Sequence, residues 1–435
     1  MPARRLCIAF AAAASLAAPA VVAGASRDCG TYDGRGCAPA SARVDLRRPA
    51  FSHPTRITNP LFPISRLQSA VLLGRVDGRP FRSETTLLPG TSVVVWDGRR
   101  TRVRLSQYMA FVDGHIDEVA LDRYAQADDG SVWYLGEDVF DYRRGTIFVT
   151  EGTWLAGRDG PPAMIMPASP KVGDAFRTEN IPGVVFEEVT VNATGRTVRG
   201  PHGPVAGAMV GDELHLDGSH SPKTFAPGYG EFLTIEGHDV EALALAAPTD
   251  RLPGRLPRQL RSLVTRSFAV VEDARLADWE AATANAGAIR ASWVSIKPLA
   301  PRLIAPPLRR DIDWLVQAAR AHHADRTARL ALGVARFALD LELRFRPVST
   351  VDAERFHLWT QQLRVDAAGR DLAAVTGDTA TLEWLRDRLI GALRPPALRQ
   401  LDNGLRDLRA ATDARNLPAA ADHAARVGAL VRRLP

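Results

Sequence analysis

Four residues of the C-terminal half have the types and spacing from which a metal site could be built. They are His322, Asp325, His357 and Asp366. Imidazole and carboxylate groups are common metal ligands, and helical bundles can bring them together in a core. The spacing of Glu354 and His357 is that of carboxylate-bridged sites, although one such pair is weak evidence. Asp325 falls on an apolar stripe, and Arg329 four residues later offers the alternative of a structural ion pair.

The segment YAQADDGSVWYLGED, residues 124–138, is the second candidate. Its Asp129-Gly130 pair favours a β-hairpin. Side chains alternate along a strand, so Trp133 and Tyr134 face opposite ways. Either both faces are covered, or one aromatic side chain lines a pocket. The residues predicted to bind a ligand are Tyr124, Trp133, Tyr134, Glu137, Asp138 and Trp154.

Carboxylates near this hairpin could also do acid–base chemistry if a cleft separated their pKa values. Glu137, Asp138, Asp141 and Glu151 have the required type, but the end of a hairpin is also commonly solvated. The sequence contains no GxSxG, CxxC or Walker motif, and Ser219-His220-Ser221 lies beside a predicted turn. We therefore predict no catalytic residue and favour a non-enzymatic role.

The elements that must position these residues change character along the chain. Residues 56–247 show short runs rich in β-branched and aromatic residues, such as Thr91–Trp96 and Val184–Val191, separated by five Asp-Gly pairs. This pattern predicts an all-β domain, an antiparallel meander curled into a barrel or half-barrel. The Pro-rich residues 248–259 are the predicted linker.

Residues 260–435 show helical periodicity and predict an all-α helical bundle. The predicted helices are 268–285, 308–345, 352–375, 379–393, 397–412 and 418–430. Most breaks between them contain Pro or Gly, which favour helix ends. The expected fold is therefore a two-domain chain, all-β and then all-α.

The N-terminal residues indicate export. Arg4 and Arg5 precede an apolar run and a small-residue cleavage site, which predicts a signal peptide over residues 1–25. Residues 26–55 then form an N-terminal arm, in which Cys29 and Cys37 are expected to form a disulfide. No transmembrane segment is expected after cleavage. The predicted location is the periplasm, the cell envelope or the medium.

Charge is divided unevenly between the two halves. Residues 26–250 carry 23 basic and 29 acidic residues, whereas residues 251–435 carry 30 and 20. The arginines of the basic half are interleaved with Asp and Glu along helices, which is typical of solvated helix faces and argues against nucleic acid as a partner. The opposite net charges predict a contact between the acidic and the basic domain.

Several motifs of the β half resemble a family of exported bacterial β-domains with no assigned function. They are ITNPLFP (57–63), DRYAQADDGSVWYLGED, EGTW (151–154), MIMPASPKVGDAFR (164–177) and FAPGYG (225–230). The resemblance spans residues 57–247, but residues 64–110 depart from the family pattern. The helical half weakly resembles helical domains of periplasmic proteins. The resemblance implies an exported module and no particular reaction.

These observations lead to two hypotheses. The first is an exported, non-enzymatic envelope protein that binds a small apolar ligand or an envelope protein partner through its β-domain, with no cofactor. The alternative is a metal-binding or metal-dependent protein with its site in the helical bundle.

Overall fold

The computed structural model describes residues 29–432, and the predicted signal peptide lies outside them. The chain divides into two units. The β unit holds the chain up to Asp141 together with Ile147–Leu243, and the helical unit holds Tyr142–Thr146 and the chain from Ala244 onward. Cys29 and Cys37 form the predicted disulfide.

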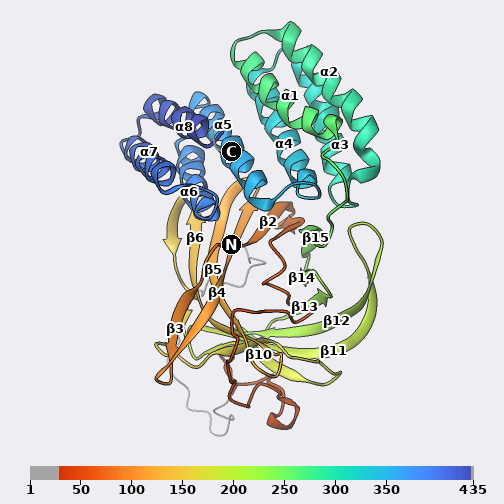
Figure 1. The fold of residues 1–435 in the computed structure, drawn as a ribbon, viewed down its shortest axis with the longest axis vertical. Coiled ribbons are helices and arrows are strands. Elements are labelled where there is room, and N and C mark those ends of the chain that lie inside the picture. Colours follow the sequence, from red (N-terminus) through yellow and green to blue (C-terminus); the bar gives the residue numbers. More distant parts are fainter. Residues whose placement is uncertain (1–28, 433–435) are drawn as a thin grey trace. The chain divides into compact units, whose positions relative to one another are not determined.

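The β unit is an antiparallel meander that curves strongly (Figure 1). Over residues 29–432 its sheet follows the order β10-β11-β12-β13-β14-β15-β1-β2-β4-β5-β6-β7, with β3 on β4 and both β8 and β9 on β6. The strands are β1 (Ser69–Val76), β2 (Arg79–Leu87), β3 (Ser92–Trp96), β4 (Arg99–Val112), β5 (His115–Gln126), β6 (Val132–Arg143), β7 (Thr146–Val149), β8 (Trp154–Leu155), β9 (Ala163–Met166), β10 (Ala175–Ile181), β11 (Val185–Arg199), β12 (Pro204–His215), β13 (His220–Ala226), β14 (Gly230–Glu236) and β15 (Asp239–Ala247). An all-β meander is therefore confirmed.

The Asp-Gly turns position the strands as predicted. Asp77, Asp97 and Asp113 have φ angles of 51°, 50° and 51°, and the glycine after each also has a positive φ. Two consecutive residues in this region give the turn whose twist matches that of the flanking strands. These turns join β1 to β2, β3 to β4 and β4 to β5.

The hairpin of residues 124–138 is also confirmed. Tyr124, Ala125 and Gln126 of β5 pair with Tyr134, Trp133 and Val132 of β6. All four residues from Val132 to Leu135 are buried, so both faces of this strand are covered. These side chains belong to the main hydrophobic core of the β unit.

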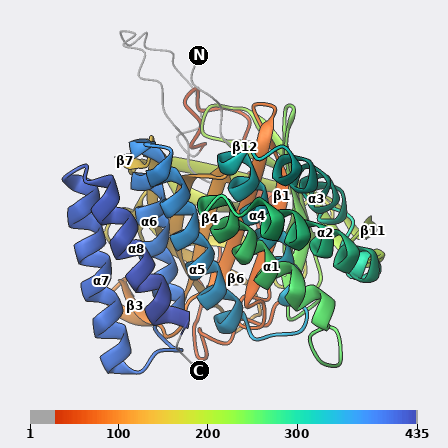
Figure 2. The same cartoon turned by 90° about the horizontal axis from the view of Figure 1, so that it is seen from above.

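The helical unit contains two groups of four helices over its described residues. In each group every helix packs against at least two others of the group, and α4 packs against α5. Figures 1 and 2 show α1–α4 and α5–α8 as the two groups. The helices are α1 (Arg258–Arg275), α2 (Trp279–Ile296), α3 (Ala305–Arg320), α4 (Ala324–Glu342), α5 (Val348–Ala368), α6 (Leu372–Leu389), α7 (Pro395–Asp413) and α8 (Leu417–Arg432). Among residues 29–432, no helix is both long and apolar enough to cross a bilayer.

Three predicted helix ranges were wrong because their breaks lack a strong helix-breaking signal. The ranges 268–285, 308–345 and 352–375 each run across two helices. The connections turn at Ala277, His322 and Arg370, which have φ angles of 58°, 56° and 59°. A non-glycine residue in this left-handed region is uncommon, so residue type gives little warning. Arg415 plays the same role between α7 and α8.

Close packing of β1 against β15 gives a stability prediction. A Cβ at Gly74 would lie 1.6 Å from the carbonyl oxygen of Val240, so the backbone must move to admit any side chain. We expect Gly74→Ala to lower the free energy of unfolding by about 3 kcal/mol, measured by urea denaturation. In the matched control Gly287→Ala, on α2, a Cβ meets nothing within 4 Å. Helix propensity should make that control neutral or stabilising by up to about 1 kcal/mol.

Candidate functional site

A cavity of about 70 Å³ lies inside the β unit. Its apolar and aromatic walls come from Phe62, Ile64, Leu67, Ala70, Leu72, Tyr108, Tyr124, Ile165, Phe225 and Tyr229. Its acidic lining comes from Glu118, Asp122, Glu187, Glu213, Glu231 and Glu241. Lys223 is the one basic residue among the described residues that line it. The lining of this enclosed space therefore contains many more carboxylates than cations.

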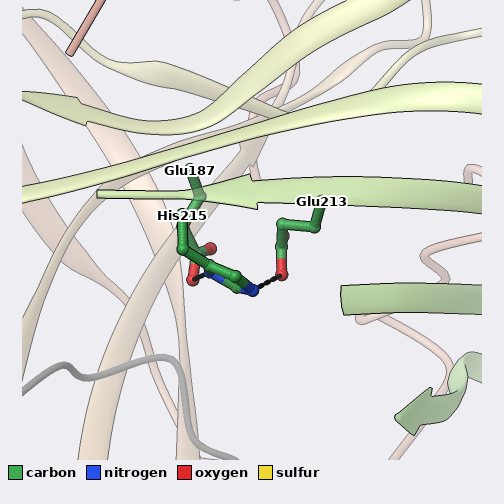
Figure 3. A group of neighbouring side chains, drawn as sticks. All are labelled: Glu187, Glu213 and His215. Carbon is green, nitrogen blue, oxygen red and sulfur yellow. Dashed lines mark ion pairs between the residues drawn. The ribbon is translucent and has the colours of Figure 1, made fainter. Parts of the chain in front are cut away.

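Strand register explains why the polar residues of β11, β12 and β13 meet. Glu187 pairs with His215, and Glu213 pairs with Ser221. His215 lies two residues after Glu213, and Lys223 lies two after Ser221, so all five side chains share one face of the sheet. Figure 3 shows the imidazole of His215 between the two carboxylates.

These side chains form a compact buried ion network. His215 Nδ1 lies 3.5 Å from Glu187 Oε1, and His215 Nε2 lies 3.9 Å from Glu213 Oε2. The ammonium of Lys223 lies 2.6 Å from Glu213 Oε2. The hydroxyl of Thr178 lies 3.2 Å from Glu187 Oε2 and 3.4 Å from Glu213 Oε1.

The network separates the pKa values of its two carboxyls. Burial raises the pKa of Glu213 to about 7, aided by the charge of Glu187. Burial also acts on Glu187, but the charge of Lys223 and the hydrogen bond and charge of His215 lower its pKa overall. Burial opposes protonation of His215, yet the hydrogen bond to Glu187 and the charges of both glutamates raise its pKa.

Glu187, Glu213 and His215 are the one group of three or more potential metal ligands found among the described residues. Their ligand atoms lie within 4.8 Å of one another, and the donor set suits a divalent ion. However, Lys223 already contacts Glu213, and two cations balance two carboxylates when His215 is protonated. A metal ion would have to displace this internal compensation.

The order Ser221, His215, Glu187 is also that of a nucleophile, a base and an orienting acid. Ser221 Oγ lies 2.7 Å from His215 Nε2, which is within hydrogen-bond reach. Ser221 is only 1% exposed, and neither it nor His215 lines the cavity. A substrate carbonyl would not reach the hydroxyl, so the contact is a buried structural hydrogen bond.

A second buried network crosses β5, β6 and β8. Asp122 pairs with Glu137, and Glu137 pairs with Trp154. The hydroxyl of Tyr134 lies 2.7 Å from Asp122 Oδ1 and 3.0 Å from Glu137 Oε2. The indole of Trp154 donates to Glu179 Oε1 at 3.0 Å. Both Glu137 and Glu179 are fully buried.

Glu137 and Glu179 share a hydrogen bond, and two carboxyls can do this only when one holds a proton. Burial raises the pKa of Glu137 to about 8, and burial together with the charge of Glu137 raises that of Glu179 well above its ordinary value. Burial likewise raises the pKa of Asp122 to about 6 and that of Glu241 to about 8. Glu137, Glu179 and Glu241 are therefore mostly protonated at neutral pH.

The structure separates the six residues predicted to bind a ligand. Tyr124 alone among them lines the cavity. It stacks on Tyr134 at 4.8 Å between ring centroids, and Tyr134 meets Trp154 edge-on at 5.4 Å. Glu137 lies in the buried network behind the cavity wall. Trp133 packs in the core and donates to Ser131 Oγ, whereas Asp138 forms an ion pair with Arg123.

The structure does not bring the predicted metal ligands of the helical unit together. His322 is not mid-helix: it is exposed in the connection between α3 and α4 and stacks on Trp279. Asp325 does not face the core but is exposed in the first turn of α4. Arg329 joins Asp325 to the buried Asp366, as the ion-pair alternative predicts. His357 is buried against Phe268.

Sequence reasoning missed Glu179, Glu187, Glu213, His215 and Lys223. The available signal was a polar residue on the inward face of a strand otherwise rich in buried apolar residues, as in DELHL (212–216). The alternation of odd and even positions along the strand does not identify these residues, because either face of such a strand can be the inner one.

No family model matches the chain. No curated protein matches it either. The resemblance of residues 57–247 to exported β-domains therefore stays a prediction.

The shared proton of Glu137 and Glu179 makes stability depend on pH. A carboxyl whose pKa is raised on folding binds more protons when folded, so stability falls as pH rises from its ordinary pKa to its raised one. We expect the free energy of unfolding to fall between about pH 4.5 and 8, by urea denaturation. Glu137→Gln should flatten this slope and be more stable than the parent at pH 8.

The exposed Glu151→Gln provides the control, which should keep the parental slope. Asp122, Glu213 and Glu241 titrate in the same window, so Glu137→Gln should reduce the slope without removing it. A parental slope in Glu137→Gln would show that the pair does not share a proton.

Proposed function

We propose that the β unit is a non-enzymatic binding module for a small alkylammonium ion. The observation that carries this proposal is the cavity lining, which combines six carboxyls and several aromatic rings with a single lysine. This ligand differs from the small apolar ligand expected from the sequence because the enclosed lining is acidic.

The charge of the lining favours a cationic ligand. A buried carboxylate must be neutralised by a proton, a hydrogen bond or a cation. Lys223 forms an ion pair with Glu213, and its charge also lowers the pKa of Glu187. Burial raises the pKa values of Asp122 and Glu241 to about 6 and about 8, so both carboxyls bind protons more readily than exposed ones. A bound ammonium group could replace those protons.

The aromatic side chains favour an alkylated ammonium ion over a bare metal ion. Phe62 meets Tyr124 edge-on at 5.0 Å, and both line the cavity with Phe225. The faces of aromatic rings attract organic cations, and cages of such rings recognise quaternary ammonium groups. Leu67, Leu72 and similar side chains offer contacts for the alkyl groups.

We further propose that the chain is exported and acts in the envelope or outside the cell. The disulfide between Cys29 and Cys37 supports this, because such bonds persist in oxidising compartments. The predicted signal peptide is consistent with the same route.

Adjacent glutamates on β11 give a matched test. Glu187 lines the cavity, whereas Glu188 is equally buried but contacts Arg177 and the backbone of Ala38. We expect tetramethylammonium to bind the full chain in calorimetry. Glu187→Gln should weaken binding at least about tenfold through loss of a buried charge, while Glu188→Gln should leave it unchanged.

The neutral isostere 2,2-dimethylpropan-1-ol controls for shape and should bind far more weakly. Melting curves show whether each variant is folded. Equal weakening by both substitutions, or equal binding of the alcohol, would contradict the proposal. Binding of Zn²⁺ without tetramethylammonium would instead favour a metal at Glu187, Glu213 and His215.

Binding should also be linked to proton release. Asp122, Glu213 and Glu241 have pKa values raised to about 6, 7 and 8, and a nearby cation favours their ionised forms. Apparent affinity for tetramethylammonium should therefore rise between pH 6 and 8, with protons released on binding. Calorimetry in phosphate and in Tris buffers measures that release, because the two buffers differ in heat of ionisation. An affinity for tetramethylammonium that does not change with pH would refute the exchange of protons for the bound cation.

A further inference from the structure

We propose that a groove in the helical unit binds an amphiphilic carboxylate, with its alkyl chain against apolar side chains of α1, α8 and the end of α6, and its anionic head beside Arg432. The groove has a volume of about 440 Å³ and is lined by α1, α5, α8 and the end of α6 with the residues after it. Its charge and its unit differ from those of the β cavity, so this inference is independent of the proposed ammonium site.

Two of the three arginines that line the groove are compensated by glutamates. Arg261 and Arg346 each form ion pairs with both Glu342 and Glu354. These four groups balance one another. Arg432 lines the same groove and has no acidic partner among residues 29–432. A carboxylate would supply that partner.

His357 provides a hydrogen-bonding group next to this charge. Its side chain is buried and lines the groove, with Phe268 edge-on at 4.7 Å. Burial and the charges of Arg432 and Arg364 lower its pKa to about 4, so the imidazole is neutral at pH 7. A neutral imidazole still has one N–H to donate to a carboxylate oxygen.

Part of the remaining lining suits an alkyl chain, and the hydroxyl side chains of Thr265, Ser349 and Thr350 line the rest. Phe268, Leu389, Leu393 and Val431 contribute apolar side chains, and Ala353 and Ala392 leave room beside them. The groove extends along α5 from Ser349 to His357. Eight residues of helix span about 12 Å, the length of a medium alkyl chain. Figure 2 shows α5 flanked by α8 and α1.

Titration of the full chain with decanoate tests this inference by calorimetry. Arg432→Glu should weaken decanoate binding at least about tenfold, since it replaces attraction of the head group by repulsion. Arg426→Glu is the matched control: it makes the same charge change on α8 at an exposed residue away from the groove, and it should leave binding unchanged. Decan-1-ol should bind at least about tenfold more weakly than decanoate.

Three results would overturn the inference: no binding of decanoate by the folded parent, equal weakening by both substitutions, or equal binding of the alcohol. Tetramethylammonium at saturation should not change the decanoate affinity. Competition between the two would place decanoate elsewhere, and would also overturn it. Failure of the ammonium site leaves this test intact, since the two ligands are titrated separately.

Discussion

Carboxylates enclosed within the β unit impose the constraint on which the rest of its interior depends. Each must be neutralised, because an uncompensated charge away from water costs several kcal/mol. The interior uses three solutions. Lys223 and His215 compensate Glu187 and Glu213, a shared proton joins Glu137 to Glu179, and burial keeps Glu241 protonated near neutral pH. The same group types thus reach different charge states according to their neighbours, and the ionic part and the protonated part meet at the cavity.

Strand geometry distributes these groups. Alternation along β11 places Glu187 on the cavity face and Glu188, equally buried, on the opposite face, although the two are adjacent. The register of β10 against β11 shifts between Arg177 and Glu179, and the intervening Thr178 reaches both Glu187 and Glu213 while Glu179 receives the indole of Trp154. Such bulges redirect side chains without ending the strand. One irregularity therefore joins the two buried networks.

The sequence predicts the elements of this fold better than the contacts between them. Asp-Gly pairs predict hairpins because backbone twist at the turn is a local property, and Asp77, Asp97 and Asp113 behave accordingly. Helix breaks at Ala277, His322 and Arg370 escape prediction because each helix ends in a backbone hydrogen-bonded cap whose residue at positive φ is not the usual glycine. The cavity residues escape for a different reason. Glu187, His215 and Lys223 lie on three strands, and only the register brings them to one face. The aromatic hairpin of residues 124–138 could be predicted from its local sequence, but most of its rings pack in the core, and only Tyr124 lines the cavity.

The proposed binding role of the β unit rests on the same balance of charges. A catalytic acid and base must reach a substrate, yet Ser221 is buried, and neither Ser221 nor His215 lines the cavity. Three carboxyls that line the cavity, those of Asp122, Glu213 and Glu241, have raised pKa values, and a cation can displace their protons without any bond being made or broken in the ligand. Protons and a cation compete for the same carboxylate oxygens. The cavity carboxyls whose ionisation lowers the stability of the folded protein as pH rises are therefore those best able to accept an ammonium ion. Stability of the empty interior and affinity for a cation are thus opposed consequences of one arrangement of charges.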